Sequence, residues 1–186
     1  MIFMKKIFVI LSFLALFIGS SFSETFIDFP DKVWLPECKH EATDVVSRLS
    51  PHEIHHYEGF SLCYREAYEQ SEWVAYKLTK EDLVKNVARN KNFTEDERIT
   101  TGSALNIDYK QSGYDRGHLA PSADMCRNAK TQRECFMFSN ISPQNHNMNS
   151  GIWANAESYA RNMAKTYGSV YVVTGPLLEK PAMDYK

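Results

Sequence analysis

Alternating apolar and polar residues in the first half of the chain predict two half-buried strands. The alternation runs over residues 60–64 and returns over residues 73–78, and we expect these two strands to pair antiparallel. Residues 169–174 are rich in valine and lead into a Gly-Pro pair, a pattern that predicts a buried strand. A further short strand is expected over residues 136–138.

Helical periodicity is strongest in the stretch that begins at Asn149 and ends before Gly168. Apolar residues recur there at helical spacing, and a glycine just past them is a common helix terminator. The predicted buried face consists of Ile152, Ala156, Tyr159, Ala160 and Met163.

Weaker signals predict shorter elements elsewhere. Short helices are expected over residues 40–49, over residues 80–87 and within residues 122–134. The second of these opens with a threonine and an aspartate at the spacing of a capping box. Residues 89–112 are polar and predict a long surface loop, a kind of segment that is often functional.

Strands and helices mix without a regular strand–helix–strand repeat, so the predicted fold class is α+β. We expect a mixed, mainly antiparallel sheet flanked by helices. With 186 residues and no internal repeat, the chain is long enough for one domain with a full core.

The first residues have the organisation of a secretory signal peptide. Lys5 and Lys6 precede an apolar run over residues 7–18, and small residues follow it up to Ser23. The run has 12 residues, whereas a membrane-spanning helix needs roughly 20. We therefore expect residues 1–23 to be removed and residues 24–186 to be secreted or periplasmic, with no stable membrane association after cleavage.

The charge balance is slightly acidic. The full chain has 21 basic and 23 acidic residues, and the loss of two lysines with the signal peptide gives the mature chain a net charge of −4. Nucleic-acid binders are usually basic, so this balance argues against broad electrostatic attraction to DNA or RNA. An enzyme can use local arginines and a bound cation instead, so a nuclease is not excluded.

The mature chain has four cysteines, and an even number in an exported protein suggests disulfides. Sequence order favours the pairs Cys38–Cys63 and Cys126–Cys135, although four cysteines allow three pairings. Two or more free, buried thiols are the alternative.

The most informative stretch covers residues 114–121, which read Tyr-Asp-Arg-Gly-His-Leu-Ala-Pro. Imidazole titrates near neutral pH, so His118 can act as a general base. Arg116 offers a planar guanidinium to phosphate oxygens. Gly117 is expected to permit a sharp backbone turn beside the histidine. These are the parts needed for attack of water on a phosphodiester.

The helix that begins at Asn149 adds an amide and a carboxylate. Asn149 has a side-chain oxygen suited to a hard cation such as Mg²⁺, which prefers oxygen ligands and keeps several waters. At 100° per residue, Glu157 lies about 80° around the helix from Asn149, where it could hold a metal-bound water. Arg161 lies one turn further, where it can pair with Glu157 or touch phosphate.

Each of these residues alone has a simpler explanation. A lone histidine is more often structural, Asn149 could be only an N-cap, and Glu157 and Arg161 could be a solvated pair. Trp153 is expected in the core under either interpretation. Motif matches carry a false-positive risk, so the joint occurrence of the residues is what favours a catalytic site.

Together, the motifs resemble those of the DNA/RNA non-specific endonucleases, the family of secreted bacterial nucleases and mitochondrial endonuclease G. The resemblance is carried by residues 73–76, 112–124, 139–144, 149–153 and 174–176, within a region from about residue 57 to about residue 178. It implies a ββα-metal (His-metal finger) site and cleavage of DNA and RNA with little sequence preference, leaving 5′-phosphate ends. The implied cofactor is Mg²⁺, with Mn²⁺ as an alternative. The implied partners are DNA and RNA, a second copy of the chain, or an inhibitor protein.

The resemblance also implies a role for each matched residue. His118 would be the general base, Asn149 the direct Mg²⁺ ligand, and Glu157 the residue that holds a metal-bound water. Arg116 and Arg161 would contact phosphate or support the waters around the metal. The other candidates are Arg89 as the arginine that stabilises the transition state, Asp115 as the residue that orients the loop or a metal-bound water, and Asn140 as an indirect support of the metal.

The sequence departs from the family in length. Family members continue past the strand that ends in Gly-Pro, so we expect the C-terminal part of the family fold to be missing from this chain. Missing strands could leave an exposed sheet edge. The alternative interpretation is therefore a truncated, inactive homologue that binds nucleic acid without cleaving it.

A rival metal motif precedes the first strand. His52, Glu53 and His56 match the zinc-protease pattern, in which two histidines lie one helical turn apart with a glutamate between them. Zinc proteases place this pattern inside a long helix, whereas here Pro51 precedes it and Gly59 follows it. A zinc metalloprotease is therefore kept as a remote alternative.

Overall fold

The computed structural model describes residues 35–38 and 52–178 of the chain. The signal peptide expected over residues 1–23 and the helix expected over residues 40–49 lie outside the described residues. Among the helices that are described, none combines the length and the apolar character needed to cross a membrane.

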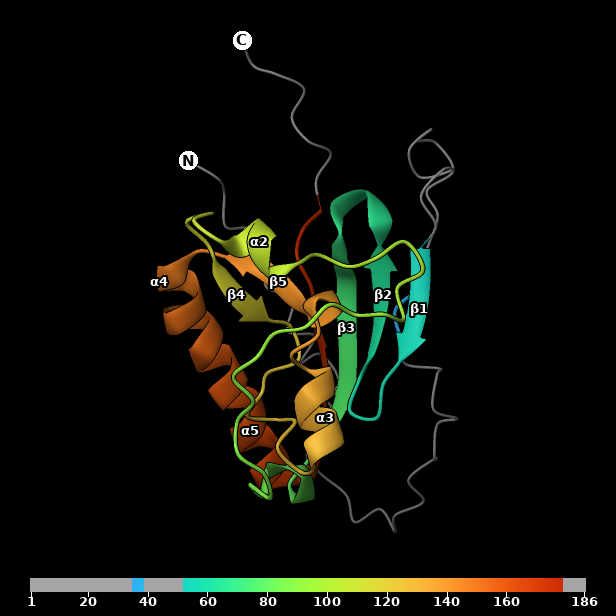
Figure 1. The fold of residues 1–186 in the computed structure, drawn as a ribbon. Helices are drawn as coiled ribbons and strands as arrows, with labels where there is room; N and C mark the ends of the chain where they lie inside the picture. The colour runs from blue at the N-terminus through green and yellow to red at the C-terminus, as the bar shows by residue number, and fades with distance from the viewer. Residues whose placement is uncertain (1–34, 39–51, 179–186) are drawn as a thin grey trace.

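Strands and short helices alternate irregularly up to one long helix near the end of the described chain (Figure 1). The strands are β1 (His52–His56), β2 (Ser61–Arg65), β3 (Gln70–Thr79), β4 (Asp115–His118), β5 (Ile141–Gln144) and β6 (Ser169–Thr174). The helices are α2 (Asn106–Tyr109), α3 (Ala129–Glu134), α4 (His146–Met148) and α5 (Ala154–Tyr167). Single 3₁₀ turns lie at Glu66–Tyr68, Glu81–Leu83 and Phe138–Asn140, and a π turn, Asn149–Trp153, joins α4 to α5. The α+β class is thus confirmed.

The main sheet has the strand order β1-β2-β3-β6, and each neighbouring pair is antiparallel. The predicted pairing of the two alternating stretches is confirmed, with Cys63 of β2 opposite Trp73 of β3. The predicted valine-rich strand is β6, which runs beside β3 from Val74 opposite Thr174 to Thr79 opposite Ser169. It lies at the end of the strand order and is not the buried strand expected, because only Val172 of its residues is buried.

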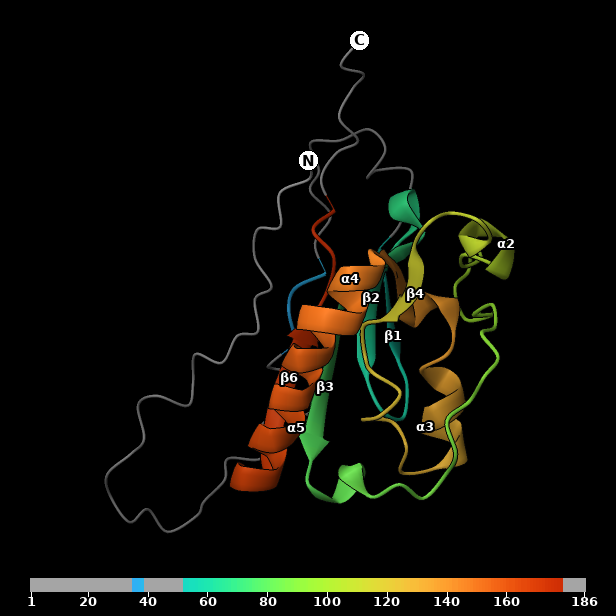
Figure 2. The same cartoon turned by 90° about the vertical axis from the view of Figure 1, so that its left-hand side faces the viewer.

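The two faces of the main sheet carry different clusters. One face packs against α5 and the loops that follow β4, and it forms the main core (Figure 2). The buried strand residues of this cluster are Leu62, Tyr64, Val74, Tyr76, Leu78 and Val172. The opposite face carries Cys63, Trp73 and Ala75, which the short described segment with Leu35 and Cys38 covers.

The disulfide expected between Cys38 and Cys63 is present and fixes this segment to β2. The second expected pair is wrong, because Cys126 and Cys135 are free, buried thiols. Their sulfur atoms are directed at separate backbone carbonyls, 3.2 Å from the oxygen of Ala123 and 3.4 Å from that of Gln132. Each thiol thus has its own local acceptor, and helix α3 lies between the two cysteines in the sequence.

Strands β4 and β5 form a separate two-stranded antiparallel sheet, and α4 begins two residues after β5. The strand expected over residues 136–138 is wrong. The N–H groups of Phe136 and Met137 still bond back to the carbonyls of Arg133 and Glu134, so the chain is leaving α3 there. The strand starts only at Ile141.

The long helix begins one turn earlier than expected. Asn145 is its N-cap, with its side chain accepting hydrogen bonds from the N–H groups of Asn147 and Met148. The expected C-terminal stop at Gly168 is confirmed, and its φ of 89° is a left-handed conformation that glycine adopts without strain.

The buried face of α5 also differs from the expected one. Ile152 and Tyr159, expected to be buried, are 49% and 48% exposed, whereas Trp153 and Ala160 are buried as expected and Ala164 is buried in addition. The indole N–H of Trp153 donates to the carbonyl of His118 at 3.1 Å and thereby fixes the rotation of the helix. The small alanines then face the sheet.

Two further sequence expectations need correction. The helix expected over residues 80–87 is a single 3₁₀ turn, although Thr79 and Asp82 do form capping hydrogen bonds. Beyond that turn, the N–H groups of Asn86 and Val87 both donate to the carbonyl of Cys126, which draws the chain into an extended path. The expected surface loop over residues 89–112 contributes buried residues instead of lying wholly on the surface.

The buried anchor of that loop is Asp96. Its carboxylate accepts hydrogen bonds from the hydroxyls of Tyr57 and Ser139 and from the N–H of Arg98. Its own N–H donates to Ser103 Oγ at 2.8 Å. A carboxylate bonded on several sides can be fully buried, and it holds the loop against the core.

We predict that Asp96→Ala lowers the free energy of unfolding by about 3 kcal/mol, because two buried hydroxyls lose their acceptor. Urea denaturation followed by circular dichroism measures this. Glu97→Ala, at an exposed neighbour, is the matched control and should change stability by less than about 0.5 kcal/mol. Equal stabilities of the two variants would contradict the anchoring role.

Candidate active site

The residues singled out by sequence gather around the two-stranded sheet and the helix that follows it. Strand β4 carries Asp115, Arg116 and His118, and the paired strand β5 leads into α4 (Figure 1). The order is strand, strand, helix, as a ββα finger requires.

Gly117 has a different purpose from the one expected. It lies in the extended strand β4, not at a turn. A Cβ atom there would fall 2.0 Å from Cδ of Gln144, whose side chain folds over the strand. The absence of a side chain at Gly117 therefore leaves room for the side chain of Gln144 over β4.

His118 is buried at the end of β4, with 8% of its surface exposed. Its ring lies between two aromatic side chains, with centroid distances of 4.6 Å to Phe136 and 5.6 Å to Phe93. Among the described residues, Nε2 has no hydrogen-bond partner. A buried polar atom that is left without a partner is unusual and marks a position where a ligand or water is expected.

Burial lowers the pKa of His118 to about 3, and the positive charge of Arg89 adds to this effect. Protonation would place a charge in an apolar setting beside a guanidinium, so the imidazole is neutral at physiological pH. A neutral imidazole has a free lone pair that can accept a proton.

Phe93 and Phe136 form a pair of rings that we call the aromatic platform, with centroids 4.9 Å apart. The guanidinium of Arg116 lies 5.5 Å from the Phe93 ring, and that of Arg89 lies 5.1 Å from the Phe136 ring. The platform therefore holds two positive charges near His118 by cation–π contacts. Arg116 also lies 5.7 Å from the ring of Tyr109.

Asp115 joins the start of β4 to the start of the long helix. Its Oδ2 accepts a hydrogen bond from Asn149 Nδ2 and lies near His146 Nδ1, both at 2.9 Å. These bonds, that from Asn149 first, lower the pKa of Asp115, so its carboxylate is ionised. An ionised carboxylate can only accept hydrogen bonds, so the amide nitrogen of Asn149 faces Asp115. The amide oxygen of Asn149 is left for another partner.

The other end of the site contains an ion-pair cluster. Arg161 Nη1 lies 3.0 Å from Asp124 Oδ1 and 3.7 Å from Glu157 Oε2. Asp124 is buried and also accepts a 2.8 Å hydrogen bond from the hydroxyl of Tyr76. Burial raises the pKa of Glu157 to about 7, with Arg161 opposing the shift. Arg161 thus has carboxylates on two sides.

Asn140 does not face the site with its side chain. Its Oδ1 accepts from the N–H of Ala120 at 2.9 Å, and its Nδ2 donates to the carbonyls of Ala120 and Cys135. Its function in the fold is to fix the backbone that follows His118.

Comparisons with known proteins agree with this geometry. Residues 40–185 match the family described as DNA/RNA non-specific endonuclease. The chain belongs to this family. It is 38% identical over 122 residues to the mitochondrial endonuclease G of Homo sapiens. The aligned region covers 64% of this chain and 41% of that relative.

Two further relatives extend the comparison. The mitochondrial nuclease of Saccharomyces cerevisiae is 38% identical over 141 residues, or 73% of this chain and 43% of that protein. A chain in the crystal structure of an EndoG/EndoGI complex matches with a TM-score of 0.64 and 35% identity, over 68% of this chain and 54% of that chain. The chain spans about two fifths of the length of the two curated relatives.

The π turn Asn149–Trp153 is a feature of this candidate site that sequence spacing did not predict. A π turn has more residues per turn than an α turn, so each of its residues rotates by less than about 100° around the helix axis. This reduces the offset of about 80° expected between Asn149 and Glu157. The two side chains are therefore closer to one face of the helix than regular α-helical spacing gives.

Several residues that contribute to the site were not predicted from the sequence. Phe93 and Phe136 form the aromatic platform. His146 contacts Asp115, and Asp124 contacts Arg161. Asp124 lies at the end of a matched segment, a signal that could have identified it. The platform residues have no local signal, because the pairing of Phe93 with Phe136 depends on the path of a loop.

The zinc-protease pattern does not form a metal site. His52 and His56 lie four residues apart on strand β1, not on a helix. At about 3.3 Å per residue, their Cα atoms are roughly 13 Å apart, too far for both imidazoles to bind one zinc ion. His56 Nδ1 instead lies 2.8 Å from Ser61 Oγ.

The raised pKa of Glu157 predicts a pH dependence of stability. Its folded-state pKa of about 7 exceeds the ordinary value of 4.5, so the protonated form stabilises the fold. This contribution is fully present below pH 4.5 and is lost as the pH rises through 7. Between pH 5 and pH 8, wild type should lose about 2 kcal/mol relative to Glu157→Gln.

Urea denaturation of both proteins in the presence of a chelator measures this difference. The exposed Glu95→Gln is the matched control and should follow wild type at both pH values. A stability gap between wild type and Glu157→Gln that stays constant with pH would show that the carboxyl titrates normally.

Proposed function

We propose that this chain is a Mg²⁺-dependent, sugar-non-specific endonuclease that hydrolyses phosphodiester bonds of DNA and RNA and leaves 5′-phosphate ends. The observation that carries the proposal is the buried, neutral imidazole of His118 with its unpartnered Nε2, flanked by the guanidinium groups of Arg89 and Arg116. Membership of the endonuclease family supports the reaction type.

The residues around Asn149 fit a hard divalent cation. The amide oxygen is turned away from Asp115, whose ionised carboxylate supplies the negative charge that such an ion prefers, and a bound cation would favour the ionised form of Glu157. Asn149 would be the direct ligand, and Asp115 and Glu157 would accept hydrogen bonds from waters of the ion. When bound, Mg²⁺ supplies positive charge that stabilises the developing negative charge of the phosphate and leaving oxygen.

His118 would take a proton from the attacking water at Nε2. Its low pKa in the free protein keeps the imidazole deprotonated and ready to accept a proton. Bound phosphate brings negative charge beside the ring, which raises the pKa toward the value that an efficient general base needs. The two platform arginines would meet the non-bridging phosphate oxygens.

Arg161 has a different proposed role from the one first expected. Its guanidinium is engaged by Asp124 and Glu157, so we assign it the task of holding Glu157 in place. Direct contact with phosphate is left to Arg89 and Arg116, whose guanidinium groups are held against aromatic rings.

We also propose a secreted or periplasmic location, which the Cys38–Cys63 disulfide supports because such bonds persist in oxidising compartments. An inhibitor protein is a proposed partner, since the related EndoG occurs in a complex with EndoGI. A homodimer remains a prediction from the sequence resemblance.

The first test is His118→Gln. Because His118 packs against two rings, an alanine would leave a cavity, and glutamine retains more volume. Loss of the base should reduce plasmid and RNA degradation by roughly 100- to 10,000-fold. His55→Gln, on β1, is the matched control and should retain activity.

Thermal unfolding should first establish that both histidine variants are folded. Degradation by folded His118→Gln at the wild-type rate would refute the assignment of the base. Binding of DNA by wild type, without any cleavage when Mg²⁺ is present, would favour the inactive nucleic-acid-binding homologue.

The second test concerns the cation. Asn149→Ala should raise the Mg²⁺ concentration needed for half-maximal plasmid cleavage by at least about tenfold, because an oxygen ligand is lost. Asn147→Ala, an exposed asparagine of α4, should leave the Mg²⁺ dependence unchanged. Identical Mg²⁺ titrations for the two variants, or full activity in a chelator, would argue against this metal site.

A further inference from the structure

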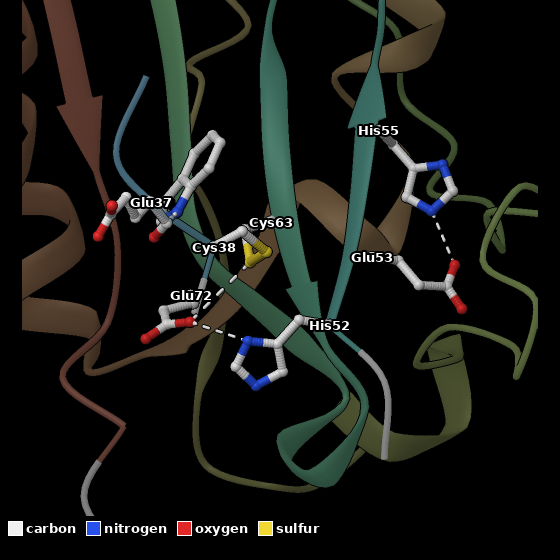
Figure 3. The surroundings of a disulfide bond; sticks show 8 residues. Glu37, Cys38, His52, Glu53, His55, Cys63 and Glu72 are labelled. Atoms are coloured by element: carbon white, nitrogen blue, oxygen red, sulfur yellow. Dashed lines mark hydrogen bonds and ion pairs between the residues drawn. A yellow bond between two sulfur atoms is a disulfide. The ribbon is translucent and has the colours of Figure 1, made fainter. Parts of the chain in front are cut away.

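A second cluster of metal-binding side chains lies on the face of the main sheet that points away from the finger. One ligand atom from each of Cys38, His52 and Cys63 lies within 4.8 Å of the others. Figure 3 shows the imidazole of His52 and the carboxylate of Glu72 beside the disulfide. The endonuclease reaction uses none of these four residues.

Strand register brings the imidazole and the sulfur together. Ile54 of β1 is opposite Cys63 of β2, so these two residues share a face of the sheet. His52 lies two residues from Ile54 and points to the same face. Its side chain is only 3% exposed.

A bulge in β3 brings in the carboxylate. Cys63 is opposite Trp73, but the next residue, Tyr64, is opposite Ser71, so Glu72 is an extra residue in its strand. Bulges re-aim side chains, and this one directs Glu72 toward the cluster. Its Oε2 lies 3.7 Å from His52 Nδ1 and 3.9 Å from Cys63 Sγ.

The contact between Glu72 and Cys63 has little value in the oxidised protein. A disulfide sulfur carries no hydrogen, so it cannot donate to the carboxylate. After reduction, two thiols would lie close to one imidazole and one carboxylate. Zinc binds such a set tetrahedrally, with bonds of about 2.3 Å to sulfur and 2.0–2.2 Å to nitrogen or oxygen.

We propose that reduction of the Cys38–Cys63 disulfide creates a binding site for a thiophilic divalent cation of the Zn²⁺ type. A dithiol reductant supplies two electrons and two protons, the S–S bond breaks, and the reductant becomes a disulfide. Binding of the cation then displaces the two thiol protons, and both thiolates, His52 and Glu72 become its four ligands.

The segment that carries Cys38 has contacts that can hold it against the sheet while the cation replaces the disulfide. The indole N–H of Trp73 donates to the carbonyl of Glu37 at 3.3 Å, so a second contact holds the segment with Cys38 when the disulfide opens. Glu72 is 35% exposed at its side chain and leaves a route for the ion. The cation would then replace the disulfide as the link between this segment and β2. The proposal does not depend on the nuclease function.

The test uses Co²⁺ as a spectroscopic probe of the full chain after signal removal, before and after reduction by a thiol-free phosphine. The expected result is one reduction-dependent Co²⁺ per chain, with the near-ultraviolet charge-transfer absorption of thiolate ligands and tetrahedral visible bands. Zn²⁺ should displace it. The oxidised protein still contains Cys126 and Cys135, so it controls for binding through those thiols.

His52→Ala and Glu72→Gln should each weaken Co²⁺ binding at least about tenfold, as ligand loss requires, whereas His55→Ala should not. Absence of a reduction-dependent thiolate band, or equal Co²⁺ affinity in all three variants, overturns the proposal. If the reduced chain loses its circular dichroism signal, recovery on adding Zn²⁺ supports the site, and failure to recover overturns it.

Discussion

The fixed backbone from His118 to Ala120 is the constraint on which the active site depends. His118 pairs with Ile141 across the finger, and its carbonyl accepts from the indole of Trp153. The next carbonyl, at Leu119, accepts from Thr174 Oγ1 of β6 at 2.9 Å. The finger (β4, β5 and α4), the long helix and the main sheet therefore all contact this short segment. Together these contacts fix the position of the imidazole of His118.

This constraint explains how the buried imidazole of His118 is held while its Nε2 keeps a free lone pair. The ring gains its position from packing and its backbone bonds, not from a side-chain hydrogen bond, so Nε2 stays available. Two cationic side chains are held by aromatic rings instead of by carboxylates. The slightly acidic chain thus keeps two positive charges near His118 although its net charge is negative.

The sequence was informative where local pattern decides the structure. Alternation over β2 and β3 and the glycine stop at Gly168 predicted elements that are present. Expectations were wrong where tertiary contacts decide. The rotation of α5 follows from Trp153, and a pairing between Cys126 and Cys135 is absent because each thiol has its own carbonyl. The π turn and the need for Gly117 also come from contacts between elements, which no local period records.

The two free thiols have a practical consequence. Burial raises the pKa of Cys135 to about 12, and both sulfurs are shielded from solvent in the folded chain. Alkylating reagents attack the thiolate, so they reach these positions only when the chain opens. The mass added by such a reagent therefore reports how often the native domain opens, and it does so without reference to catalysis.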